Sequence, residues 1–227
     1  MKNSKNKICI RSFLVIMLVV FALKAGAQKK GEFGLRYMPT VSSFEMKTES
    51  GGTVKGEATL GYGVGAFLGF NFTEHIGIQG EIIYSSISQK YKESDVEREI
   101  NLKYVNIPLL FSLNTGKSNP VNLNIVAGPQ IGLSVGSSVN STGGNGTYSS
   151  QAVVSVKKSD IGLAYGAGVD FGLNEAQTFR LGLGFRGVLG LIDISDNNNT
   201  VVKDTYYVID KTKIKTYSGY LGISFLF

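Results

Sequence analysis

A single histidine and a few scattered carboxylates are the first residues to test for catalytic chemistry. His75 follows Glu74 in a very short connection between two stretches of alternating polarity. A Ser-His-Asp arrangement needs three side chains within mutual hydrogen-bond reach, which one histidine in a turn does not supply. We therefore expect His75 to be an ordinary turn residue, and we expect no catalytic residues and no enzyme activity.

Metal and cofactor sites are also weakly indicated. Asp193 and the run 196–199 offer the hard oxygen ligands that calcium prefers, but the spacing and the turn glycine of a calcium loop are missing. The segment 166–168 is rich in glycine, yet no helix follows it whose N-terminus could hold a phosphate. We expect no metal and no cofactor.

Charged residues within the alternating stretches point to ion pairing instead. They share a face with glycine and other small residues, and they are Arg36, Glu81, Asp170, Arg180 and Arg186. In the hairpin around 174–177, Asp170 and Arg180 are expected to lie opposite each other as a salt bridge, with the other three forming a second cluster. Such charges within a membrane protein either fill its interior or mark an ion path. We favour a structural role for these residues, as a charge network that fills the lumen of a barrel, and a gated ion path is the alternative.

The elements that position these residues are eight stretches in which apolar residues alternate with polar residues or glycine. A period of two is typical of β-strands. It predicts strands at 31–41, 58–72, 75–90, 99–113, 120–137, 159–173, 178–193 and 213–227. The connections alternate between long and polar (42–57, 91–98, 138–158, 194–212) and short (73–74, 114–119, 174–177).

The apolar face is expected to contact lipid. Phenylalanines gather beside the short connections and the chain end, and tyrosines lie toward the long connections, as in the two aromatic girdles of a membrane barrel. The opposite face is expected to be polar and lined by glycine, which disfavours a soluble barrel with a lipophilic ligand inside. We predict an all-β, eight-stranded, antiparallel up-and-down transmembrane β-barrel with short periplasmic turns and long extracellular loops.

The first 27 residues have the features of a secretory signal peptide. A basic start precedes an apolar run of 13–23 and a small-residue site at 25–27, and the run is too short to span a bilayer as a helix. We expect cleavage after Ala27, which removes the only cysteine, Cys9, and leaves the barrel domain at 28–227. Five of the 23 basic residues leave with this segment, so 18 face 17 acidic ones and no nucleic-acid partner is indicated.

Four segments resemble the PorT-like outer-membrane β-barrel proteins, a porin-like family. The segment 104–111 (YVNIPLLF) is similar to that family's Tyr-x-x-Ile-Pro-Leu-Leu strand, and 127–132 (AGPQIG) to its Ala-Gly-Pro segment. The segment 166–171 (GAGVDF) is similar to its Gly-x-Gly-x-Asp/Glu strand, and 221–227 (LGISFLF) to its usual chain end. The resemblance implies a location in the outer membrane of a Gram-negative envelope, and one branch of the family is implicated in protein secretion and gliding.

The C-terminal alternation ending in Phe225 and Phe227 resembles the signal by which the barrel-assembly machinery recognises its clients. The expected partners are outer-membrane lipid, this machinery during biogenesis, and an extracellular ligand or a secretion-system component. We expect a non-enzymatic barrel with a plugged polar lumen and a structural, binding or adhesive role for the loops. The alternative is a narrow porin-like channel or a PorT-like component of a secretion system.

Overall fold

The computed structural model describes residues 30–47, 53–55, 57–93, 96–142, 158–192 and 212–227. The signal-peptide prediction and the calcium-like run 196–199 lie outside these residues. Among the described residues, no helix is long and apolar enough to cross a membrane.

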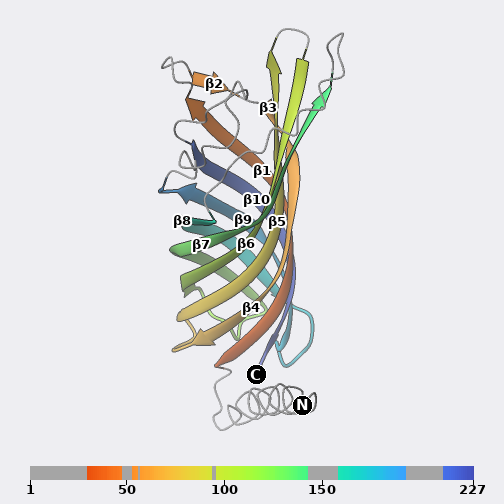
Figure 1. Cartoon of the computed structure of the whole chain (residues 1–227). Coiled ribbons are helices and arrows are strands. Elements are labelled where there is room, and N and C mark those ends of the chain that lie inside the picture. The colour runs from red at the N-terminus through yellow and green to blue at the C-terminus, as the bar shows by residue number, and fades with distance from the viewer. Residues whose placement is uncertain (1–29, 48–52, 56, 94–95, 143–157, 193–211) are drawn as a thin grey trace, which may run out of the picture.

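Eight long antiparallel strands form a closed barrel (Figure 1), which confirms the predicted fold class. Each strand pairs with its neighbour along the chain, and the last strand pairs with the first. This β1–β10 seam closes the sheet, so the barrel has no unpaired strand edge there. The long strands are β1 (Gly31–Lys47), β4 (Leu60–Asn71), β5 (Ile76–Glu93), β6 (Val96–Asn114), β7 (Val121–Thr142), β8 (Ser159–Gly172), β9 (Phe179–Gly190) and β10 (Thr212–Leu226). Two short strands, β2 (Thr53–Lys55) and β3 (Glu57–Ala58), pair with β1 and β5.

The apolar side chains face outward, as the alternation predicts. Leu123, Leu163 and Leu183 are 56%, 42% and 42% exposed, although a water-soluble barrel would bury such residues. The same strands turn their alternate residues inward, where glycines and polar groups are buried. The outer surface is therefore the one that contacts hydrocarbon.

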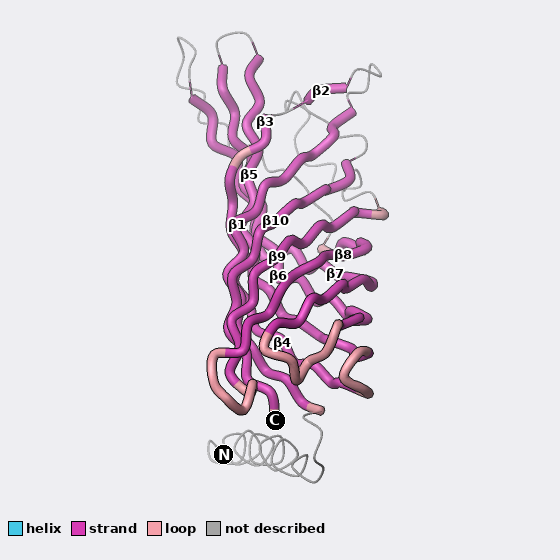
Figure 2. The backbone as a smooth tube through the Cα atoms, turned by 180° about the vertical axis from the view of Figure 1, so that it is seen from behind, coloured by secondary structure: helices cyan, strands magenta, loops and turns pink. Residues whose placement is uncertain are grey.

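Both ends of the described chain and the three short turns lie at one end of the barrel (Figure 2). At the other end the strands are longer than predicted. Strands β5 and β6 remain paired as far as Glu93 and Val96, so the connection expected at 91–98 is mostly a hairpin. Strand β1 likewise continues to Lys47 and β7 to Thr142. The lipid-facing pattern stops before these strand ends because backbone pairing continues in water, where neither face needs to be apolar.

The interior is layered rather than uniformly polar, which corrects the expectation from sequence. Met38, Ile83 and Tyr220 form one buried apolar cluster, and a second cluster contains Leu110, Val126, Ala164 and the half-buried Val188. On β1 and β5, Arg36 and Glu81 lie two residues nearer the short turns than Met38 and Ile83 of the first cluster. The sequence pattern missed the apolar layer because on β5, β6 and β7 both faces carry large aliphatic residues over a short stretch.

Two glycines make room for the Tyr220 ring inside the barrel. A Cβ atom at Gly168 would lie 1.9 Å from the Tyr220 hydroxyl, and one at Gly184 would lie 2.6 Å from its ring. Neither position could carry a side chain with Tyr220 in place. Glycine in these strands therefore serves close packing across a narrow lumen.

Candidate functional site

Two clusters of charged side chains lie inside the barrel toward the end with the short turns. The first, which we call the upper cluster, consists of Arg36, Glu81 and Arg186. Arg36 Nη1 lies 2.5 Å from Glu81 Oε1, and Arg186 donates to both carboxylate oxygens, at 3.0 and 3.3 Å. Glu81 is 2% exposed, so the carboxylate is held almost entirely by protein groups.

Three further groups hold the upper cluster in position. The guanidinium carbon of Arg36 lies 4.1 Å from the centre of the Phe67 ring and 4.8 Å from that of Tyr220. Gln79 donates a hydrogen bond to Glu81 from the same face of β5. Two guanidinium groups share one carboxylate here, and the aromatic rings offset part of the remaining positive charge.

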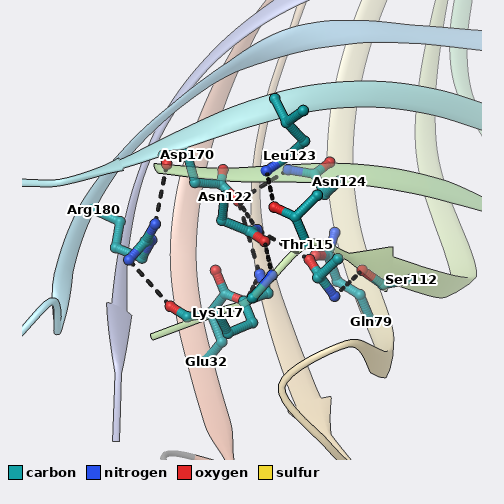
Figure 3. A network of polar contacts seen from close by, with 12 residues as sticks. Glu32, Gln79, Ser112, Thr115, Lys117, Asn122, Leu123, Asn124, Asp170 and Arg180 are labelled. Carbon is teal, nitrogen blue, oxygen red and sulfur yellow. Dashed lines mark hydrogen bonds and ion pairs between the residues drawn. The ribbon is translucent and has the colours of Figure 1, made fainter. Parts of the chain in front are cut away.

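The second group, the lower cluster, consists of Glu32, Lys117, Asp170 and Arg180 (Figure 3). Lys117 belongs to the turn between β6 and β7, which folds back into the barrel opening. Its Nζ lies 2.7 Å from Glu32 Oε2 and 3.9 Å from Asp170 Oδ2. Lys117 is only 6% exposed, although it belongs to a turn.

Amide side chains complete the coordination of Asp170. Asn122 and Asn124 donate to Asp170 Oδ2 at 3.0 and 2.9 Å, and both lie on the inward face of β7. Asn122 also donates to Asn114 Oδ1 and accepts a hydrogen bond from the Gly116 backbone. The carboxylate is therefore satisfied without Arg180.

The Arg180 side chain binds the backbone of the turn that contains Lys117. Its Nη1 donates to the carbonyl of Lys117 at 3.1 Å, and its Nη2 donates to those of Asn119 and Asp170 at 2.9 and 3.0 Å. Arg180 is fully buried. A planar guanidinium with several donors suits this task, because it can satisfy carbonyls from two separate segments.

The predicted side-chain salt bridge between Asp170 and Arg180 is wrong. In the ladder Asp170 lies opposite Gly182, and Arg180 lies opposite Gly172. The prediction assumed a four-residue connection, whereas Leu173 N donates to the carbonyl of Phe179, so five residues connect the strands. Gln177, with a φ of 53°, takes the left-handed conformation that this longer turn needs. The extra residue moves the partner of Asp170 from Leu181 to Gly182, which is two positions beyond Arg180.

The structure brings Arg36, Glu81 and Arg186 together and adds two residues that the sequence analysis missed. Glu32 shares the inward face of β1 with Arg36, four residues apart, so the period of two was a sufficient signal for it. Lys117 carried no such signal, because a turn has no periodicity and its direction follows from tertiary contacts.

The turns themselves show no catalytic arrangement among the described residues. His75 Nδ1 lies 3.2 Å from the Asn114 carbonyl, and Glu74 accepts hydrogen bonds from the backbone and hydroxyl of Ser118. These contacts connect two turns. Within the described part of the chain, no three His, Cys, Asp or Glu side chains are grouped to hold a metal ion.

Taken together, the two clusters occupy the cross-section of the barrel at its turn end. The interior of an eight-stranded barrel is just wide enough for side chains to fill. Arginine, lysine and asparagine side chains do so here, with Arg180 and Asn122 showing no exposed surface. The arrangement can hold two turns and several strands in one register. It does not extend to the end of the barrel that carries the long loops.

Comparison with known proteins gives one family and a set of similar folds. A family model described as an outer membrane protein β-barrel domain matches residues 27–196. The outer membrane protein OprG from Pseudomonas aeruginosa is 15% identical, with 88% of this chain and 97% of that chain covered and a TM-score of 0.53. Neisserial surface protein A is 14% identical, with 89% and 99% covered and a TM-score of 0.46.

Another similar structure is Ail, the attachment invasion locus protein of Yersinia pestis, solved with the heparin analogue sucrose octasulfate. It is 16% identical, with 86% of this chain and 99% of that chain covered and a TM-score of 0.40. No curated protein matches the chain. Of these three structures, only OprG is similar enough to support an argument, and at this identity the argument extends to the fold alone.

Proposed function

Because this chain belongs to the outer membrane protein β-barrel domain family, we propose that it is a non-enzymatic barrel that acts through its extracellular end. The protein is an integral eight-stranded barrel of the outer membrane, in contact with lipid. Its function under this proposal is to support the envelope or to present loops that bind or adhere. The lumen serves as a stable interior and not as a channel.

The single observation that carries this proposal is the filled turn end of the lumen. The upper and lower clusters place seven charged side chains across the barrel, all of them buried or nearly so. A water-filled path would leave these groups exposed to solvent. Buried ion pairs of this kind fix register and exclude water.

Planar-bilayer recording tests the closed lumen. We expect the purified protein to give no stable single-channel steps after insertion, because arginine and lysine side chains occupy the cross-section. An open porin prepared in the same detergent provides the positive control for insertion. Long-lived, large conductance steps from the folded protein would contradict the proposal.

The alternative is a narrow porin-like channel or a PorT-like component of a secretion system. The resemblance of the segments 104–111 and 166–171 to PorT-like strands supports this alternative. It predicts specific capture of periplasmic or secretion-system proteins by the tagged barrel, with another small barrel as the control bait. A barrel that captures only the assembly machinery would favour the first proposal.

Under either proposal, we also propose that residues 1–27 form a signal peptide that is removed during export. We expect the protein recovered from outer membranes to begin at Gln28, since the small residues Ala25 and Ala27 fit a signal-peptidase site. Intact-mass measurement checks this directly. Replacing Ala27 with a bulky residue such as Leu should cause the uncleaved precursor to accumulate, whereas the same change at Ala22 should not.

The C-terminal phenylalanine is proposed as the assembly signal. The backbones of Phe227 and Gly31 exchange hydrogen bonds of 2.8 and 2.9 Å at the seam, and the Phe225 and Phe227 rings stack. We expect Phe227→Asp to reduce the folded barrel in the outer membrane several-fold, as measured by heat-modifiable gel mobility. Phe227→Tyr is the control and should assemble normally. Equal assembly of Phe227→Asp would argue against the signal.

A further inference from the structure

A pocket lies inside the barrel on the long-loop side of the upper cluster. Its walls combine apolar side chains with a few polar groups, among them Met38, Ile83, Tyr104, Asn106, Asp160 and Val188. Sites for small molecules are commonly of this kind, with a largely apolar wall and a few polar groups that orient the ligand. Neither the closed lumen nor the loops account for this pocket.

Two oxygen atoms in the pocket are buried without a hydrogen-bond partner. They are the Asp160 Oδ1 oxygen and the Tyr104 hydroxyl, on residues that are 9% and 3% exposed. A buried carboxylate oxygen without a donor is costly, and such a group in a native structure needs an explanation. A ligand that supplies hydrogen-bond donors would satisfy both atoms.

Gly132 lies between the strands that carry these groups. It lies opposite Asn106 on β6 and opposite Asp160 on β8, with its backbone between them. A Cβ at Gly132 would lie 3.0 Å from Asn106 Oδ1, 3.4 Å from the Tyr104 ring and 3.5 Å from Asp160 Cβ. The three side chains therefore lie around the Gly132 backbone, and a Cβ there would press on Asn106 Oδ1.

We propose that this pocket binds a small organic cation that carries a protonated primary amine. An ammonium group has three donors and no acceptor. The pocket offers three oxygen acceptors, namely Asp160 Oδ1, the Tyr104 hydroxyl and Asn106 Oδ1. The apolar wall of Met38 and Ile83 would contact a short hydrocarbon body.

Other ligand classes fit these residues less well. Asp160 is the one carboxylate in the lining, and a metal ion would need more anionic ligands than the described residues provide. An anion would lie against the Asp160 carboxylate. Arg186 also lines the pocket; its two terminal nitrogens each donate to Glu81, and its Nε is buried without a partner.

NMR titration of the purified barrel in detergent micelles tests the proposal, with n-propylammonium as the probe. We expect saturable shifts of the backbone amides of Tyr104, Gly132 and Asp160. Asp160→Asn should weaken binding about tenfold or more, because a charge-assisted hydrogen bond is lost. Tyr104→Phe should weaken it less, and Gly132→Ala should weaken it by filling the space.

The controls separate charge recognition from general affinity. Glu175→Gln removes an exposed carboxylate in a short turn at the opposite end and should leave binding unchanged. Neutral 1-propanol and anionic propionate, which have the same carbon skeleton, should bind at least tenfold more weakly than the amine. Equal binding of either one, or unchanged affinity in an Asp160→Asn barrel that keeps its heat-modifiable mobility, would overturn the proposal.

Discussion

Replacing Glu81 with glutamine is expected to lower the free energy of unfolding by about 3–5 kcal/mol, the usual cost of removing one partner from a buried ion pair. Glutamine has the same shape but no charge, so Arg36 and Arg186 would lose their shared counter-charge. Its amide NH₂ would also face guanidinium donors at distances where the carboxylate accepts, 2.5 and 3.0 Å. Both guanidinium groups are largely shielded from water, so solvent cannot replace the lost interaction.

Urea unfolding in detergent micelles measures this loss. The chain contains no tryptophan, so far-ultraviolet circular dichroism is the suitable probe, with heat-modifiable gel mobility as a second readout. Glu175→Gln makes the same chemical change at an exposed position and should alter stability by no more than a surface substitution does. A loss below about 1 kcal/mol at Glu81 would mean that the upper cluster behaves like a surface ion pair.

Replacing Lys117 with methionine is expected to have a similar effect, about 3–5 kcal/mol, through a different mechanism. Methionine keeps the length of the side chain but leaves Glu32 buried without its ion-pair partner. Asp170 keeps its two asparagine donors, so Glu32 should carry most of the cost. The turn from 115 to 120 would lose its charged contact with β1, although Arg180 would still hold its backbone.

A double-mutant cycle distinguishes this mechanism from a general effect on the turn. Glu32→Gln combined with Lys117→Met should cost less than the sum of the two single changes by at least about 1 kcal/mol, because the unpaired charge is gone. Lys158→Met, at an exposed lysine, is the matched control. Strict additivity would show that the contact of 2.7 Å between Lys117 and Glu32 contributes little.

The orientation of the barrel could be predicted from sequence because it depends on a local property. Side chains of a strand alternate whatever the rest of the chain does, so residues such as Leu123 and Asn124 must face opposite ways. The same logic placed Arg36, Glu81 and Arg186 on one face of their strands. Their common inward face limited which residues could meet in the lumen.

Pairings that depend on turn length could not be predicted in this way. Asp170 faces Gly182, two positions beyond Arg180, and the additional residue in the turn that contains Gln177 accounts for one of these positions. Lys117 enters the barrel because Arg180 donates hydrogen bonds to the carbonyls of Lys117 and Asn119 in its turn, a tertiary interaction with no local signature. The ends of β5 and β6 were missed for a related reason: hydropathy reports lipid contact and not backbone pairing.

The extension of β5 and β6 gives the extracellular end a fixed geometry. Beyond Tyr84 the outward positions of β5 change from apolar to polar with Ser86 and Lys90, while pairing with β6 continues to Glu93. The hairpin therefore extends beyond the lipid-facing part of the barrel, and adding one residue to each strand would lengthen it by about 3.4 Å. Insertions made two residues at a time in each strand would keep the facing of every side chain, so the length of this hairpin can be changed independently of the barrel beneath it.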